Sequence, residues 1–149
     1  VMILCKPGQG AGLQARLKRW LEARKLKLNE EKTRLVDTRE EGIEFLGFAV
    51  AWRRGLRSKR WYPHVEPSAK SQAKMRDKVR KVLEVRTRNQ AAVEVVRKVN
   101  QITRGWAGAF HHGNSSRVFG RQQLFVRNRL RRWLWRKHDR THALFEFFT

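Results

Sequence analysis

The sequence predicts an α+β protein in which a partial β-sheet with one helix is followed by three helices. Up to about residue 66 the apolar residues form short runs or alternate, as in strands, with one helical stripe among them. After Pro63 and Pro67 they recur with a helical period instead. The 149 residues suffice for one domain, or for a small domain plus a fragment, and a hydrophobic content of 40% makes a buried core feasible.

The N-terminal part is predicted to contain one strand and one helix. The apolar run from Val1 to Cys5, closed by Lys6-Pro7-Gly8, is typical of a buried strand. Because the chain opens on such a run, we expect it to begin inside a larger fold. An apolar stripe then predicts a helix over about 11–24. Its members are Leu13, Leu17, Trp20 and Leu21.

Two short strands and a hairpin are expected next. Residues 33–38 and 42–48 resemble strands around a turn at 39–41. Apolar and polar residues alternate on both sides of the basic run 53–57. This pattern predicts a second hairpin over 48–65 with a charged tip.

The rest of the chain is predicted to be helical. Apolar stripes indicate helices over about 68–84, 90–110 and 116–138. Charge shifts at the same boundary, since residues 1–66 carry a net +7 and residues 67–149 a net +15. The helical half therefore holds about two thirds of the total charge of +22.

The composition restricts the function. Lys and Arg total 35 against 13 Asp and Glu, an excess that opposes compactness unless a polyanion offsets it. The single cysteine, Cys5, excludes an internal disulfide or a multi-cysteine zinc site. No apolar run approaches the ~18–20 residues of a membrane-spanning helix, and no signal-peptide pattern is present. We therefore expect a folded nucleic-acid-binding protein of the cytoplasm, that is, of a bacterial or organellar interior.

The third predicted helix of the second half has two different sides. On a wheel of about 100° per residue, one side is apolar. It holds Phe119, Val126, Leu130, Trp133 and Leu134. The opposite arc holds arginines, with Trp135 in its middle. They are Arg117, Arg121, Arg127, Arg129, Arg131, Arg132 and Arg136. A solvated face usually mixes charges of both signs, whereas Asp139 is the only acid between 117 and 140, so we predict a phosphate-contacting surface.

Other candidate chemistry is weak. His111 and His112 have only the remote Cys5 as a further zinc ligand, which leaves RNA contact or helix-end packing for them. The carboxylate pairs at 30–31 and 40–41 fall at turns and are interpreted as solvated. The sequence thus predicts no metal site and no cofactor in this chain.

Four motifs resemble group II intron reverse transcriptases. Residues 26–33 (LKLNEEKT) and 43–48 (IEFLGF) are similar to two late motifs of their palm. Residues 104–114 (RGWAGAFHHGN) and 126–133 (VRNRLRRW) resemble their maturase-specific region, the thumb, also called domain X. The motifs follow the family's order and cover nearly the whole chain. The resemblance implies a partial palm β-sheet with one helix, followed by a three-helix thumb bundle.

The resemblance also implies domains and residue roles. The palm fragment would occupy 1–48, a basic hairpin connector 49–66 and the maturase-specific domain 67–149. Lys32 matches the lysine near the phosphates of the incoming nucleotide, a group able to protonate the leaving pyrophosphate. The primer grip, which holds the primer 3′ end, matches Phe45, Leu46, Gly47 and Phe48. Without the resemblance, Lys32 would be a solvated lysine and the phenylalanines plain core.

The family's Tyr-Ala-Asp-Asp box, with its catalytic aspartates, would stand just before Val1 and is not in this sequence. The chain alone is therefore expected to be inactive as a polymerase, and Mg²⁺ is expected only in the intact enzyme. The implied function is binding of group II intron RNA to assist splicing and, in the intact protein of this mobile element, holding the template–primer. The expected partners are these nucleic acids and the absent fingers and upstream palm, with no membrane.

The RNA-contacting residues would be the arginines of the third helix with Trp135, together with Arg53, Arg54, Arg57, His111 and His112. Two alternatives remain open at this point. The chain is part of a working polymerase, longer or split, or it is a generic basic RNA- or DNA-binding protein without intron specificity.

Overall fold

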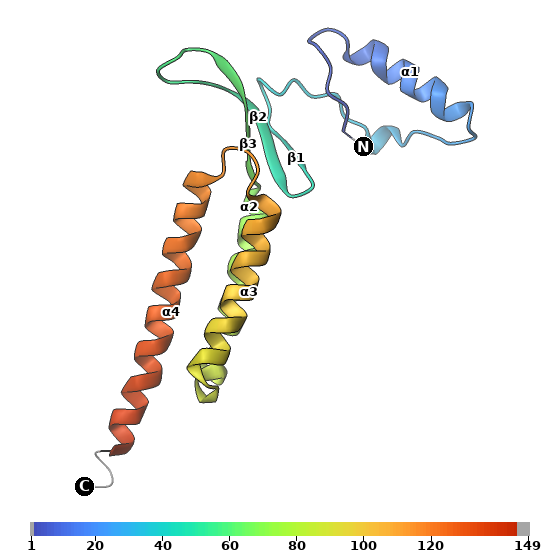
Figure 1. Cartoon of the computed structure of the whole chain (residues 1–149). Coiled ribbons are helices and arrows are strands. Elements are labelled where there is room, and N and C mark those ends of the chain that lie inside the picture. The colour runs from blue at the N-terminus through green and yellow to red at the C-terminus, as the bar shows by residue number, and fades with distance from the viewer. Residues whose placement is uncertain (1, 146–149) are drawn as a thin grey trace. The chain divides into compact units, whose positions relative to one another are not determined.

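The structure, a computed structural model, describes residues 2–145, with side chains described up to residue 138. The chain divides into two compact units. The first comprises Val1–Phe45 and Val50–Pro63, and the second comprises Leu46–Ala49 and His64–Thr149. Figure 1 shows the order of the elements along the chain. The fold is mixed α and β, as predicted, and residues 2–145 form one small sheet and four α-helices.

The first unit contains the helix α1, Gly10–Glu22, and the short 3-10 helix η1, Glu30–Lys32. None of its described residues is buried. The strands predicted at 1–5 and 33–38 are wrong, because residues 2–5 and 33–38 are irregular and belong to no strand of the described sheet. Leu4 is 73% exposed and Leu35 63% exposed. An apolar run becomes a strand only where a neighbouring strand shares a series of backbone hydrogen bonds with it, whereas residues 33–38 are reached at their end by the bond from Trp52 N–H to the Thr38 oxygen at 2.8 Å.

The sheet has three antiparallel strands in the order β1-β2-β3. These are β1 (Ile43–Phe45), β2 (Phe48–Arg54) and β3 (Trp61–Pro67). The strand predicted at 42–48 is interrupted by a two-residue turn at Leu46 and Gly47, both with positive φ, as in the type I′ turns that join twisted strands. The predicted hairpin over 48–65 is confirmed as β2 and β3.

The second unit is built on three helices, and all three were predicted. They are α2 (Ala69–Val82), α3 (Ala92–Phe110) and α4 (Ser116–Phe145), with a short 3-10 helix η2 (Val85–Asn89) between α2 and α3. The buried Ser68 caps α2, since its hydroxyl accepts a hydrogen bond from the backbone N–H of Ser71 at 3.2 Å. The helix α2 packs against both other helices.

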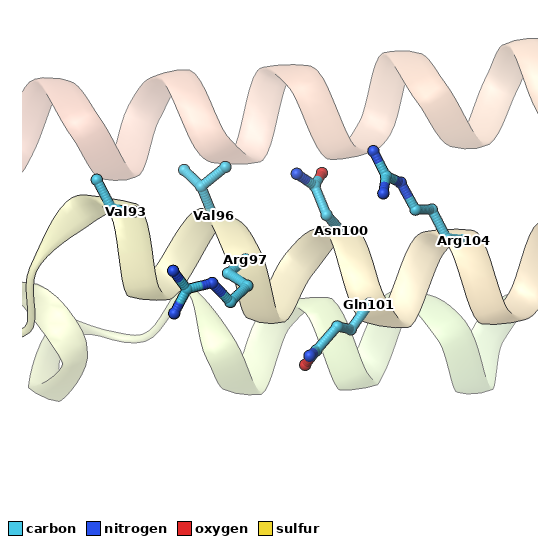
Figure 2. Close-up of a pocket in the computed structure, with 6 residues that line it drawn as sticks. All are labelled: Val93, Val96, Arg97, Asn100, Gln101 and Arg104. Atoms are coloured by element: carbon cyan, nitrogen blue, oxygen red, sulfur yellow. The ribbon is translucent and has the colours of Figure 1, made fainter.

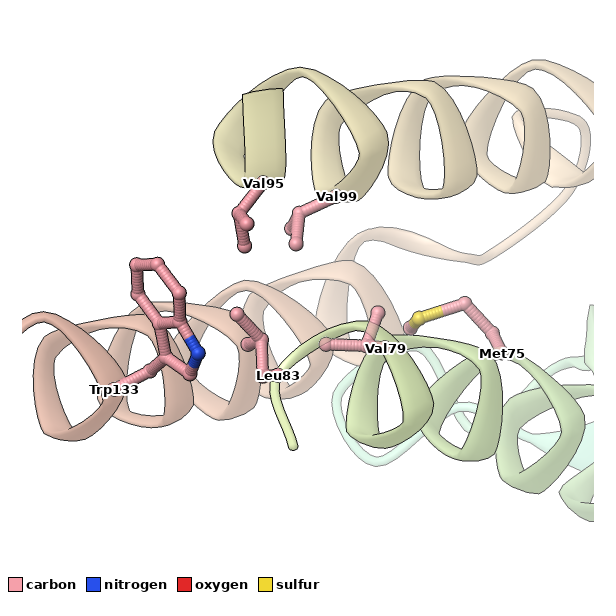
Figure 3. Close-up of a cluster of buried hydrophobic side chains, with 6 residues drawn as sticks. All are labelled: Met75, Val79, Leu83, Val95, Val99 and Trp133. Carbon is pink, nitrogen blue, oxygen red and sulfur yellow. The ribbon is translucent and has the colours of Figure 1, made fainter. Parts of the chain in front are cut away.

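The core of this unit lies between the three helices (Figure 3). The helix α3 contributes Val95 and Val99, and α4 contributes Trp133. Its remaining buried members, from α2 and its C-cap, are Met75, Val79 and Leu83. The Trp133 ring also donates from Nε1 to the Thr87 hydroxyl, at 3.1 Å, so the core includes a satisfied polar contact with η2. This packing fixes which side of α4 is left to solvent.

Candidate nucleic-acid interface

The exposed side of α4 carries a row of arginines. Trp135 lies among them with 66% of its surface exposed. We call this set the arginine face, and its cationic members are Arg117, Arg121, Arg127, Arg131, Arg132 and Arg136, all exposed. There is no acidic residue from Ser116 to His138, and no carboxylate among the described side chains forms an ion pair with these six. The face is therefore a concentrated positive charge with no internal neutralisation.

The buried side of α4 matches the prediction in part. Trp133 is buried, and the other four predicted apolar residues are half-buried. Val118 and Gln122 are buried too and were missed. On the helical wheel these two residues extend the buried side toward Arg129, which lies between them. Arg129 is half-buried, and its Nε finds no hydrogen-bond partner among the described residues, so this arginine does not belong to the arginine face.

Several cations elsewhere are neutralised locally. In the first unit, Lys18 Nζ lies 2.6 Å from Glu30 Oε1, and this hydrogen bond and the opposite charge lower the pKa of Glu30 and raise the pKa of Lys18. The pKa of Asp37 is lowered by hydrogen bonds from the backbone and side chain of Arg39. Such exposed pairs contribute little to stability. They show that some cations of the chain, in contrast to the six of the arginine face, lie beside an acidic partner.

The β2–β3 hairpin presents a second group of exposed cations. Arg53, Arg54 and Arg57, all proposed from the sequence, are exposed there. The Nε of Arg54 donates to the backbone oxygen of Lys59 at 2.9 Å, which anchors that side chain across the tip. The arginines expected at the charged tip are therefore accessible.

The two adjacent histidines follow the end of α3. Both are exposed, and their ring centroids are 3.7 Å apart. Nδ1 of His111 lies 2.6 Å from the backbone oxygen of Gly108. This contact places a ring nitrogen of His111 beside a carbonyl of the last turn of α3. Packing at the helix end is one of the two roles that the sequence left open for the histidines.

A shallow groove of about 450 Å³ on α3 was not predicted (Figure 2). Val93 and Val96 line one end of it, and the rest is polar. Its polar residues are Arg97, Asn100, Gln101 and Arg104. They recur at helical spacing on the side of α3 away from Val95 and Val99. That spacing was visible in the sequence, but Arg97 pairs with Glu94 at 2.6 Å, so this surface carries less net charge than α4.

Comparison with family models gives one match. The model of the group II intron, maturase-specific domain matches residues 72–146, half of the chain. The chain belongs to this family. A comparison with curated proteins finds no match, and neither does one with solved structures. The suspected resemblance to the C-terminal part of a group II intron reverse transcriptase/maturase is confirmed for this domain.

The maturase-specific domain begins in the first turn of α2 and contains all of α3. It also includes the whole arginine face. The basic surface is thus part of the domain that the family model matches.

Among the described residues, none of the helices is long and apolar enough to cross a membrane.

The palm-like motifs lie outside the matched range. Lys32 is exposed in η1, where its backbone N–H donates to the Asn29 side chain at 3.0 Å. In the suspected primer grip, Leu46 is 79% exposed at the turn tip, while the ring of Phe48 packs 4.8 Å from that of Phe110. Part of this motif is therefore half-buried and packed against α3, and its role at a primer stays a prediction.

Proposed function

We propose that this maturase-specific domain binds folded group II intron RNA through the arginine face of α4 and thereby assists splicing. The observation that carries the proposal is the set of six exposed arginines without an acid between Ser116 and His138. RNA supplies the splicing chemistry in this proposal, and the protein supplies electrostatic clamping and recognition of shape. In an intact reverse transcriptase the same surface would hold the template–primer.

The reach of the face suits a structured polyanion. From Arg117 to Arg136 the helix rises about 28 Å at 1.5 Å per residue. A rigid helix holds its guanidinium groups at fixed spacing along that length, and guanidinium groups bind phosphate oxygens in pairs. Trp135 adds an exposed ring on which a base can stack. Unstructured RNA would have to be ordered to follow the same row, whereas a folded RNA presents its phosphates in place.

The salt dependence of binding tests this proposal. Replacing Arg127, Arg131 and Arg136 together by Gln removes three charges from the exposed side of α4 and keeps helix propensity. The slope of log affinity against log salt should flatten by roughly two to three units, at ~0.7–0.9 per phosphate contact. A matched control removes three exposed charges from α2 instead. This control replaces Lys74, Lys78 and Lys81 by Gln and should change the slope by less than one unit.

Competition separates the maturase from the generic basic binder. At physiological salt, folded group II intron RNA should displace a labelled probe at a far lower concentration than an unstructured RNA of equal length. Equal competition would reduce the domain to a nonspecific polyanion binder. An unchanged slope in the α4 variant would place the main contact elsewhere.

A further inference from the structure

The β2–β3 hairpin has a closed, well-defined tip. The backbone N–H of Gly55 donates to the oxygen of Arg60 at 2.9 Å, and the N–H of Lys59 donates to the oxygen of Gly55 at 3.0 Å. Lys59 takes a positive φ of 55° to close the loop. The resulting pairing of residues 55 and 60 sets the register of the whole hairpin.

That register places two tryptophans on the same side of the ribbon. With Gly55 opposite Arg60, Arg54 lies opposite Trp61, and Trp52 lies opposite Pro63. Side chains alternate between the two sides of a strand, so Trp52, Arg54 and Trp61 share one side. The two tryptophans occupy diagonal positions across the strands, a spacing within reach of large rings. They are 40% and 51% exposed, although a tryptophan in a folded protein is usually mostly buried.

The hairpin that carries these rings is itself basic, whereas the neighbouring segment 37–41, whose Thr38 oxygen accepts a hydrogen bond from the N–H of Trp52 at 2.8 Å, holds Asp37, Glu40 and Glu41. No acidic residue occurs from Phe45 to Val65. The hairpin cations, all exposed, are Arg53, Arg54, Arg57, Lys59 and Arg60. Flat exposed rings bordered by cations match the two features of an unpaired nucleic acid strand, its base faces and its phosphates. A lipid surface fits less well, because Leu56, the apolar residue at the tip, stands next to Arg57 and would carry that charge with it into the bilayer.

We infer that the hairpin from Trp52 to Tyr62 is a separate contact site for unpaired RNA, in which bases stack on Trp52 and Trp61 and the surrounding cations bind the phosphates. The inference rests on the proposed RNA-binding function and adds a chemical preference to it. Stacking requires bases that are free of a duplex, whereas the six arginines of the arginine face need only phosphates. The two surfaces would therefore take different parts of one structured RNA.

The test uses the full chain with two labelled probes, a 12-nucleotide unstructured RNA and a 12-base-pair RNA duplex, by fluorescence anisotropy at physiological salt. Changing Trp52 and Trp61 to Ala should weaken single-strand binding by about five-fold or more per ring. Duplex binding should change less than two-fold. The same positions changed to Leu keep apolar bulk without a π-face and should behave like the Ala variants, whereas Phe should restore most of the affinity.

Trp20→Ala is the matched control. This ring is 53% exposed and lies in the same structural unit, but the guanidinium of Arg24 covers it at 3.8 Å from the ring centroid. Its loss should change neither probe. Equal weakening of both probes, or full affinity in the Leu variants, would overturn the stacking site. Loss of binding to anionic vesicles, with RNA binding intact, would assign the rings to a membrane instead.

The outcome is independent of the test of the proposed function. If folded intron RNA competes no better than unstructured RNA, the maturase function fails, yet the dependence of single-strand binding on Trp52 and Trp61 stands. If the tryptophan variants bind normally, the stacking site fails while the salt slope set by α4 is unaffected.

Discussion

Gly113, in the turn between α3 and α4, is a position where a single methyl group should be costly. Its φ is +86°, and a Cβ placed there would lie 2.5 Å from the backbone oxygen of Val65 and 3.0 Å from its Cβ. That same oxygen accepts a hydrogen bond from Asn114 N–H at 2.7 Å, and the N–H of Val65 donates to the Asn114 side chain at 3.2 Å. A side chain at Gly113 therefore strains the backbone and separates two hydrogen-bonded segments.

The expected magnitude follows from these contacts. A left-handed conformation costs a residue with a Cβ roughly 1–2 kcal/mol. Breaking the Asn114–Val65 bond adds about 1 kcal/mol or more, since a backbone group is left without its partner. Gly113→Ala should thus destabilise the helical unit by about 2–4 kcal/mol. At roughly 4–8 °C per kcal/mol for a unit of this size, the midpoint of thermal unfolding should fall by about 8–32 °C.

Urea unfolding followed by helical circular dichroism measures this change. Gly120→Ala is the control, because Gly120 is exposed within α4 and nothing lies within 4 Å of an added Cβ. Its substitution should stabilise by roughly 0.5–1 kcal/mol. Gly113→Asn retains the close contact but tolerates positive φ better, so it should lose less than Ala. A Gly113→Ala variant as stable as the wild type would refute the reasoning.

Three further predictions concern capping, ionisation and local stability. Ser68→Ala should cost about 1–2 kcal/mol in urea unfolding, because it removes the buried cap of α2, while the neighbouring exposed Ala69 offers a position where Ala69→Ser should have little effect. Because the pKa of Glu30 is lowered, its pair with Lys18 stabilises the fold above the carboxyl's unfolded pKa, and this stability is lost as pH falls through the folded pKa. Because the pKa of Lys18 is raised, the stability is lost again as pH rises through the folded pKa of the lysine. In an NMR titration, Lys18→Gln should return the pKa of Glu30 toward its ordinary 4.5, and an unchanged pKa of Glu30 would contradict the pairing. In hydrogen exchange, amides of α2, α3 and α4 should stay protected longer than those of residues 2–45, where none of the described residues is buried, and the reverse order would contradict the packing described here.

The sequence predicted the helices well because their signal is local. The stripes on α2, α3 and α4 recur over many turns, so the helices and the exposure of Trp135 followed from periodicity alone. The sequence predicted less well which side of α4 is buried. That depends on the neighbours against which α4 packs, so the burial of Val118 and Gln122 and the half-burial of Arg129 are visible only in the structure.

The strands were predicted less well because a strand exists only with a partner. Residues 33–38 have a strand-like composition, yet they form no strand, and the backbone bond from Trp52 in β2 to the Thr38 oxygen reaches only the end of the segment. The turn at Leu46 and Gly47 was read as strand, since a type I′ turn with Leu in its first position lacks the usual Asn-Gly or Asp-Gly signal. The diagonal pair of Trp52 and Trp61 likewise depended on the register of the tip, which no composition rule supplies.

The contacts of α4 with η2 decide how that helix is rolled about its own axis. A helix with a wide apolar side can rotate about its axis through tens of degrees and lose little buried area. Hydrophobic packing alone therefore does not fix its rotation. Trp133 is tied to Thr87, and the ammonium of Lys137 donates to the backbone oxygens of Arg88 and Gln90 at 2.7 and 2.9 Å. Within α4 these bonds involve only Trp133 and Lys137, but a rigid helix rotates about its axis as a whole. They therefore fix the direction in which every arginine along α4 points. Thr87 carries no charge and lies off the arginine face, yet it helps to determine where six positive charges point.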